Sequence, residues 1–285
     1  MGWLDAIILG LVEGITEYLP VSSTGHLILA AALLGLDRPE IKSSVDAFSI
    51  VIQGGAILAV LGLYRQRVAQ MIAGLLGKDP GGRKLVINLF IAFLPAAVLG
   101  LIFDDMIEAH LFRPVPVIAA LALGGVWMIV LGKGSADDDA PEADITELPW
   151  RSALMIGCFQ VVAMWPGTSR SMMTIAGGMM AGLRPKQAAE FSFLLGLPTL
   201  GGACVYKLGK NLKESHDAGV PNLFEDLGVG PVLIGVAVAT VSAWLAVRWL
   251  VGFLTTHGLA AFGWYRIVLA AVLGGAVATG LVTFN

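Results

Sequence analysis

Two carboxylates, a cluster of hydroxyls and an imidazole lie within one stretch, Glu13 to His26, of a sequence otherwise apolar enough for a lipid bilayer. Glu13 and Glu17 are four residues apart, so a helix places them on one face with their Cβ atoms about 6 Å apart. Two like charges at this distance repel unless a cation or a proton lies between them. Because ionisable groups at membrane depth are costly, this stretch predicts a functional site.

The helix that carries the glutamates must end at Pro20, and Ser22, Ser23 and Thr24 are residue types that start the next one. A helix broken inside a membrane leaves N–H groups that must face protein, water or a ligand. Such N–H groups carry partial positive charge and suit a phosphate. We therefore expect a cation between the glutamates, opposite a helix start at which Ser22 and Thr24 bind an anionic substrate.

A second short apolar segment, 151–164, is broken at Pro166 and leads to Arg170. A guanidinium is always charged, and its planar fork fits phosphate oxygens. Around it lie a glycine and four hydroxyl residues that we expect to bind the substrate: Gly167, Thr168, Ser169, Ser171 and Thr174. One break can hold a cation and the other an anion, so the pair predicts a metal-bound phosphate or diphosphate as the ligand.

The composition is that of an integral membrane protein, with 56% hydrophobic and 14% charged residues, against about 45–50% and 25% in soluble proteins. A net charge of −3 gives no indication of a nucleic-acid partner. Cys158 and Cys204 lie in apolar segments and resemble small core residues more than a disulfide or metal pair. The amino terminus lacks the basic region of a cleaved signal peptide, so we expect it to remain in the fold.

Six segments are predicted to cross the membrane fully: 46–64, 85–103, 114–132, 188–208, 229–250 and 262–283. Two shorter pairs, 3–19 with 23–35 and 151–164 with the segment ending near 182, are predicted to be re-entrant. A basic loop at 65–84 and a polar loop at 209–228 join some of these segments. The fold class expected is an all-α integral membrane protein that forms a single polytopic domain.

The two halves of the chain resemble each other. Pro20-Val-Ser-Ser aligns with Pro166-Gly-Thr-Ser, and after one gap Glu13 aligns near Gln160. Gln160 is therefore a further candidate substrate-binding residue. We expect repeat 1 at about 1–132, an acidic linker at 133–149 and repeat 2 at about 150–285. Three full spans per half is an odd number, so the second repeat must have inverted topology, and the two re-entrant tips can meet at mid-membrane.

Basic residues predict the orientation. If the 65–84 loop is cytoplasmic, eleven Lys and Arg residues, Lys133 and Arg266 among them, lie on that side and six on the other. The first tip then enters from the periplasmic face, and both termini are outside.

Three motifs closely resemble the undecaprenyl-diphosphate phosphatases, bacterial membrane enzymes also called bacitracin-resistance proteins. They are Glu13-x-x-x-Glu17, the run 20–26 and the run 166–174, and the resemblance covers essentially the whole chain. One departure is Met172, where many members would have Gly, and a bulkier side chain there could narrow the pocket.

The resemblance implies hydrolysis of undecaprenyl diphosphate to the monophosphate and inorganic phosphate. This step recycles the lipid carrier of peptidoglycan synthesis in the bacterial inner membrane, and bacitracin competes for the same lipid. A divalent cation, Mg²⁺ or Ca²⁺, is implied at Glu13 and Glu17, with essential roles for Ser23, His26 and Arg170. The oligomeric state stays open, a homodimer included, as do the preferred metal and the lipid chain length.

On these roles we base a mechanistic hypothesis in which Ser23 is the nucleophile and His26 its proton shuttle. Direct attack by water, with Ser23 only binding phosphate, stays open. Taken singly, Arg170 could merely form an interhelical ion pair.

A lipid or ion transporter is the competing class of protein, because inverted repeats with broken helices are common among transporters. A non-catalytic lipid-binding protein is a third class. Phosphate release in detergent would separate an enzyme from a transporter.

Overall fold

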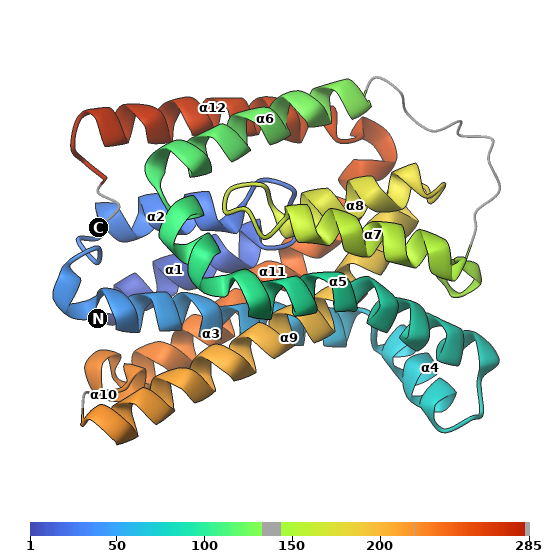
Figure 1. Ribbon diagram of the computed structural model, residues 1–285, viewed down its shortest axis with the longest axis horizontal. Coiled ribbons are helices and arrows are strands. Elements are labelled where there is room, and N and C mark those ends of the chain that lie inside the picture. Colours follow the sequence, from blue (N-terminus) through green and yellow to red (C-terminus); the bar gives the residue numbers. More distant parts are fainter. Residues whose placement is uncertain (133–143, 220, 283–285) are drawn as a thin grey trace.

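The structure, a computed structural model, describes residues 1–132, 144–219 and 221–282 (Figure 1). The first half contains α1 (Trp3–Thr16), α2 (Ser23–Leu33), α3 (Pro39–Leu63), α4 (Arg65–Leu75), α5 (Pro80–Leu111) and α6 (Pro114–Gly132). The second half contains the short 3-10 helix η1 (Ile145–Glu147), α7 (Trp150–Val162), α8 (Arg170–Met180), α9 (Pro185–Ala218), α10 (Leu223–Leu227), α11 (Val229–His257) and α12 (Ala260–Ala278). The described residues form no β-strand.

Six helices are long and apolar enough to cross a membrane, namely α3, α5, α6, α9, α11 and α12. Each predicted span coincides largely with one of them, so the all-α integral membrane fold with six long apolar helices is confirmed. The last span, 262–283, was drawn too far, because α12 ends at Ala278. Large apolar side chains on the outer surface, such as Leu101, Val115 and Val205, are each 75% exposed. Exposed apolar area of this extent suits a surface that lipid covers.

Several helices extend beyond the predicted spans. α3 begins at Pro39 instead of residue 46, since a proline fits the first turn of a helix. α5 continues through Asp104 and Asp105 as far as Leu111. α9 continues to Ala218, and Gly219, with φ of 65°, ends it. Hydropathy detects only the part of a helix that fits hydrocarbon, so the polar outer turns were missed.

The two predicted loops also contain helices. α4 occupies much of the 65–84 segment, and α10 lies inside the 209–228 segment. Of the acidic linker, Asp137, Asp138, Asp139 and Glu142 lie outside the described residues, while η1 is anchored by the buried side chain of Ile145.

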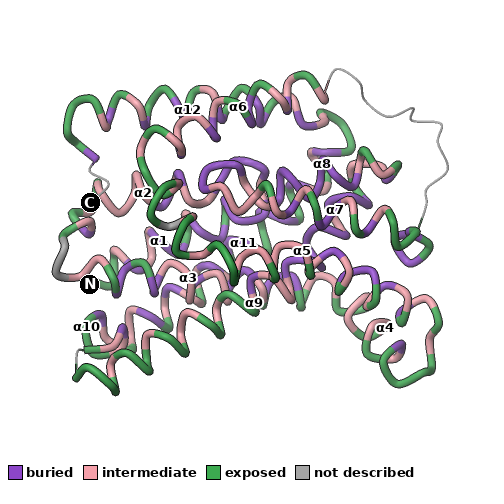
Figure 2. The backbone as a smooth tube through the Cα atoms, viewed as in Figure 1, coloured by how far each residue is buried: buried purple, intermediate pink, exposed green. Residues whose placement is uncertain are grey.

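The short helices form two hairpins, α1 with α2 and α7 with α8, whose turns lie in the middle of the molecule (Figure 1). Figure 2 shows that buried residues concentrate around these turns. α1 packs on α11 and α7 packs on α5, so each hairpin leans on a long helix of the other half. The re-entrant path of these hairpins in a bilayer and the division into two repeats stay predictions.

Glycines permit this close packing. A Cβ on Gly10 of α1 would lie 2.6 Å from the carbonyl oxygen of Gly235 in α11. A Cβ on Gly157 of α7 would lie 2.6 Å from the carbonyl oxygen of Ala92 in α5. Small residues that let two backbones approach are typical of helix pairs in membranes.

The two ends of the molecule differ: α10 lies at one end and α4 at the other (Figure 1). Of the eleven basic residues assigned to the α4 side, Lys133 lies outside the described residues. Arg266 is fully buried inside the fold, so counting it among the basic residues of the cytoplasmic surface was wrong. Without Arg266 the bias becomes ten to six, of which nine and six lie in the described residues, and it keeps its direction.

The two cysteines are both free thiols. Cys204 is partly buried, and its thiol donates to the Ile50 carbonyl at 2.9 Å. Cys158 is exposed on α7, so the prediction of core packing was wrong for this residue. α7 presents it outward because its buried face is used against α5.

Candidate active site

The two hairpins turn in the same unusual way. Ser22 and Ser169 have φ values of 72° and 74° and are the two non-glycine residues with positive φ in the described chain. Each caps the helix that follows: Ser22 Oγ accepts from the Gly25 N–H at 3.5 Å, and Ser169 Oγ accepts from the Met172 N–H at 3.3 Å. Non-glycine residues in this region are costly and cluster at functional sites. The two turns are therefore candidates for a functional site.

This geometry shifts the internal alignment by one residue. With Ser22 opposite Ser169, equivalent residues lie 147 positions apart, and the same offset pairs Glu13 with Gln160 without a gap. The proline-based alignment needed a gap because each proline lies at a different point of its turn. The capping serine marks the equivalence better, since it fixes where the next helix begins.

Glu17 connects the two tips. Its Oε2 accepts a hydrogen bond from Ser23 Oγ at 2.9 Å. Its Oε1 accepts from Arg170 Nη2 at 3.0 Å and from Arg170 Nε at 3.3 Å. Arg170 Nη1 donates to the Ser192 carbonyl at 3.1 Å. The hydroxyl of one tip and the guanidinium of the other are thus held on the two oxygens of a single buried carboxylate.

A cavity of about 150 Å³ opens at this contact. Its lining comes from both tips and from α3 and α9: Glu17, Ser22, Ser23, Thr24, Gln53, Ala163, Pro166, Gly167, Ser169, Arg170 and Leu200. Four predicted substrate-binding residues, Ser22, Thr24, Gly167 and Ser169, are among them. Gln53 was missed, although a lone amide inside an apolar span is a signal that could have found it.

Glu13 lies one helical turn before Glu17 and is fully buried. Neither of its carboxylate oxygens has a hydrogen-bond partner among the described residues. A buried carboxylate without a partner requires a proton or a cation, and oxygen donors suit Mg²⁺ or Ca²⁺. The described residues contain no group of three or more His, Cys, Asp or Glu side chains placed for a metal. The pair therefore fits a cation whose remaining ligands are water or phosphate oxygens, as is common for Mg²⁺.

His26 is turned away from Ser23. Its Nδ1 lies 2.7 Å from the Ser22 carbonyl oxygen, and its Nε2 lies 2.7 Å from the Tyr265 hydroxyl. Ser23, the first residue of α2, instead points across the break to Glu17. The structure thus brings Ser23 together with a carboxylate and not with the imidazole of the hypothesis.

The remaining predicted substrate-binding residues bond within the protein. Ser171 donates to the Leu19 carbonyl at 2.9 Å, Thr174 to the Arg170 carbonyl at 2.8 Å, Thr168 to the Trp165 carbonyl at 2.6 Å, and the Gln160 amide to the Ala92 carbonyl at 3.4 Å. They are not among the residues that line the cavity. Their hydroxyls and amide hold the second tip and its neighbours in place.

Met172 is fully buried, and its terminal methyl lies against Gly124 of α6. It is not among the residues that line the cavity. The bulk that could have narrowed the pocket is therefore accommodated behind the tip.

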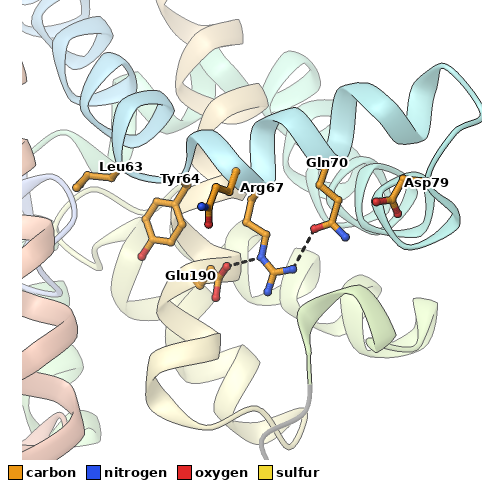
Figure 3. A pocket seen from close by; sticks show the side chains of 7 residues that line it. Leu63, Tyr64, Arg67, Gln70, Asp79 and Glu190 are labelled. Carbon is orange, nitrogen blue, oxygen red and sulfur yellow. Dashed lines mark hydrogen bonds and ion pairs between the residues drawn. The ribbon is translucent and has the colours of Figure 1, made fainter.

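A larger cavity, of about 550 Å³, lies beside α4 and is lined by Leu63, Tyr64, Gln66, Arg67, Gln70, Asp79 and Glu190 (Figure 3). Two of its charged groups, Arg67 and Glu190, already pair with each other, and Asp79 accepts from the Gly82 N–H. Arg67 bonds Glu190 at 2.8 Å and Gln70 at 3.0 Å, and it reaches Asp144 at 3.1 Å. Arg67 Nη1 also reaches the second oxygen of Asp144 at 3.4 Å, so four of its five N–H groups are engaged and one remains for a ligand. The smaller cavity between the tips is therefore the better candidate site.

Fold and site together define a polytopic, all-helical membrane protein with a buried carboxylate–hydroxyl–guanidinium site between two broken hairpins. The chain belongs to the bacitracin resistance protein BacA family, whose model matches residues 6–272.

Curated relatives of similar length support this assignment. A protein named undecaprenyl-diphosphatase in Sorangium cellulosum is 46% identical over 276 residues, which is 96% of this chain and 86% of the relative. Undecaprenyl-diphosphatase 2 of Rhodospirillum rubrum is 46% identical over 282 residues, 99% of this chain and 97% of the relative. The undecaprenyl-diphosphatase of Azotobacter vinelandii is 47% identical over 268 residues, 93% of this chain and 91% of the relative.

Proposed function

We propose that this protein hydrolyses a long-chain polyprenyl diphosphate, undecaprenyl diphosphate by likeness to its relatives, to the monophosphate and inorganic phosphate. The observation that carries the proposal is the single carboxylate, Glu17, that joins Ser23 of one tip to Arg170 of the other. A nucleophile, a proton acceptor and a phosphate-binding fork within one cavity are the groups that phosphoryl transfer needs.

Ser23 is the proposed nucleophile and Glu17 its base. Ser23 Oγ attacks the terminal phosphorus, its proton passes to Glu17 Oε2 over the existing 2.9 Å hydrogen bond, and the P–O bond to the lipid monophosphate breaks. Water then hydrolyses the phosphoserine and releases inorganic phosphate. Glu17 takes the place that the hypothesis gave to His26, because it is the group in contact with Ser23. Direct attack by water, activated by the same carboxylate, is the alternative.

Arg170 is the proposed phosphoryl clamp. Three of its five N–H groups bond Glu17 and the Ser192 carbonyl, so two N–H groups remain for phosphate oxygens. The backbone at the start of α2 and α8 adds partial positive charge on the same cavity. These groups would stabilise the negative charge that the transferring phosphoryl oxygens carry in the transition state.

Glu13 and Glu17 are the residues proposed to hold a divalent cation. When bound, such an ion neutralises diphosphate oxygens and accepts them as ligands. The protein's own contribution is to keep two buried carboxylates one turn apart at the contact between the two tips.

The proposed location is the bacterial inner membrane, with the α4 end cytoplasmic and the α10 end periplasmic. The basic residues that remain on the surface support this orientation. A diphosphate group does not cross hydrocarbon cheaply, so a site that serves an outer pool of lipid needs an outward opening. Consumption of that lipid would compete with bacitracin, in keeping with the description of the family.

The test is phosphate release from undecaprenyl diphosphate by purified protein in detergent, where no gradient can drive a transporter. We expect turnover in the wild type and a loss of at least about 100-fold in Arg170→Lys, which keeps the charge but loses the fork. Arg248→Lys, at an arginine that stacks on Trp244 in α11, is the matched control. No release by the folded wild type would exclude the enzyme and favour a transporter or a lipid-binding protein.

A further inference from the structure

α12 brings two adjacent polar side chains to the two tips, one to each. Tyr265 contacts His26 of the first hairpin, and Arg266 contacts Gly167 of the second. Successive residues of a helix point about 100° apart, so one helix inserted beside both turns can contact them with neighbouring residues. α12 itself packs mainly on α6.

The Ser22 contact fixes which nitrogen of His26 carries the proton, and the Tyr265 contact uses the other nitrogen. A carbonyl oxygen can only accept, so the 2.7 Å contact with the Ser22 carbonyl requires an N–H at Nδ1. In the neutral ring Nε2 then has no proton and accepts from the Tyr265 hydroxyl, also at 2.7 Å. The two rings lie nearly parallel, with 7° between their planes. His26 is thereby tied to the backbone of Ser22, the strained residue that begins the first tip.

The Arg266 contact holds the second tip. Arg266 is fully buried, and its Nη2 donates to the Gly167 carbonyl at 2.7 Å and to the Ala120 carbonyl at 3.0 Å. Gly167 has a φ of 97°, and a Cβ on it would lie 2.6 Å from the Val117 carbonyl oxygen. The turn thus packs closely against α6, and the buried Arg266 guanidinium donates to its Gly167 carbonyl. Burial of a cation at this depth is costly and rarely persists without a task.

We propose that Tyr265 and Arg266 are positioning residues that hold the two tips in register, Tyr265 through the His26 imidazole and Arg266 through the Gly167 carbonyl. The register matters because the site exists only where the tips meet, at Glu17, Ser23 and Arg170. The effect on turnover rests on the proposed function, whereas the effect on the tips does not.

Two structural readouts test the proposal without reference to activity. In ¹⁵N NMR of detergent-solubilised protein, with His26 assigned from a His26→Gln spectrum, we expect the Nδ1–H tautomer in the wild type. Tyr265→Phe removes one hydroxyl and should shift the Nε2 resonance. Tyr206→Phe, at an exposed tyrosine of α9, is the matched control and should not shift it.

Hydrogen exchange then separates the two contacts. Tyr265→Phe should raise amide exchange in segment 20–26 and leave 163–169 unchanged, and Arg266→Lys should do the reverse. Each variant should lower the turnover number by about tenfold or more with little change in KM, as the loss of a supporting contact does. An unaltered His26 spectrum in Tyr265→Phe, or an unaltered 163–169 segment in folded Arg266→Lys, would overturn the proposal. If the two variants alter the tips as expected but the wild type releases no phosphate, only the proposed function is refuted.

Discussion

Ser23 and Arg170 occupy the same position in the two hairpins. Each is the first residue of an eleven-residue helix, and each follows a serine with positive φ. The N–H groups of the first turn of a helix point out of its N-terminus. The side chain of the first residue lies at the same end. The two equivalent positions therefore face each other across one cavity, one with a hydroxyl and the other with a guanidinium.

Removal of the Ser23 hydroxyl should abolish the reaction and leave the fold intact. Ser23→Ala deletes the proposed nucleophile, and the neighbouring cap at Ser22 remains. We expect phosphate release to fall to the background of the assay, with an unchanged thermal midpoint. Ser49→Ala is the control, because Ser49 only bonds the Val45 carbonyl within α3. Substantial turnover in Ser23→Ala would favour direct attack by water.

The two glutamates should differ in their response to cation. Glu13 has no hydrogen-bond partner among the described residues, so Glu13→Gln should weaken only the cation site, and a higher Mg²⁺ or Ca²⁺ concentration should restore turnover. Glu17 also bonds Ser23 and Arg170, so Glu17→Gln should stay slow at every concentration. Titration of both variants with each ion checks this. An unchanged cation requirement in Glu13→Gln would remove Glu13 from the metal shell.

Composition and the two proline breaks were sufficient to predict six spans, two hairpins and the cavity-lining residues Ser22, Ser23, Thr24 and Arg170. These features depend on local sequence, because hydrocarbon imposes length and apolarity on each span. The Ser23–Glu17 bond could not be predicted in the same way. Helix periodicity places His26 near Ser23, but the turn at Ser22 decides the direction in which each side chain points.

Contacts between segments far apart in the chain could not be predicted from the sequence either. Arg266 was counted among the cytoplasmic basic residues because it lies near the start of the predicted span 262–283. Its burial follows from how α12 packs on α6, which no local pattern records. The same holds for Gln53, which reaches the cavity from α3, and for Tyr265, which reaches His26 from α12.

The Asp144–Arg67 pair should make stability depend on pH at the α4 end. Partial burial would raise the pKa of Asp144, but the Thr146 N–H and the Arg67 guanidinium together hold it below its ordinary value. A carboxyl whose pKa is lower in the folded state adds stability above its unfolded pKa of about 4, and this is lost as the pH falls through the lower folded value.

Asp144→Asn should therefore destabilise the protein near neutral pH, by about 0.2–1 kcal/mol because the pair is half-exposed. The difference from the wild type should shrink as the pH is lowered below about 4. Thermal unfolding in detergent at several pH values measures both effects. Glu147→Gln is the control, since its partner Lys84 lies in a more exposed pair. A deficit that stays constant down to acid pH would show that the Asp144 charge is not its source.

The last prediction concerns the side to which the site opens. Ser22 lines the cavity but is buried and caps α2, so a thiol there would disturb the turn. Thr24 lines the same cavity and is partly exposed, so Thr24→Cys in a background without Cys158 and Cys204 is the better probe. With the α10 end periplasmic, a membrane-impermeant maleimide added to intact spheroplasts should modify this thiol. Gln66→Cys, exposed on α4, should react only after lysis. Undecaprenyl diphosphate should slow the first reaction and not the second, because only the first thiol lies in the proposed site. The reverse pattern, with Gln66→Cys modified in intact spheroplasts and Thr24→Cys protected until lysis, would place the site on the cytoplasmic side and contradict the orientation inferred from the basic residues.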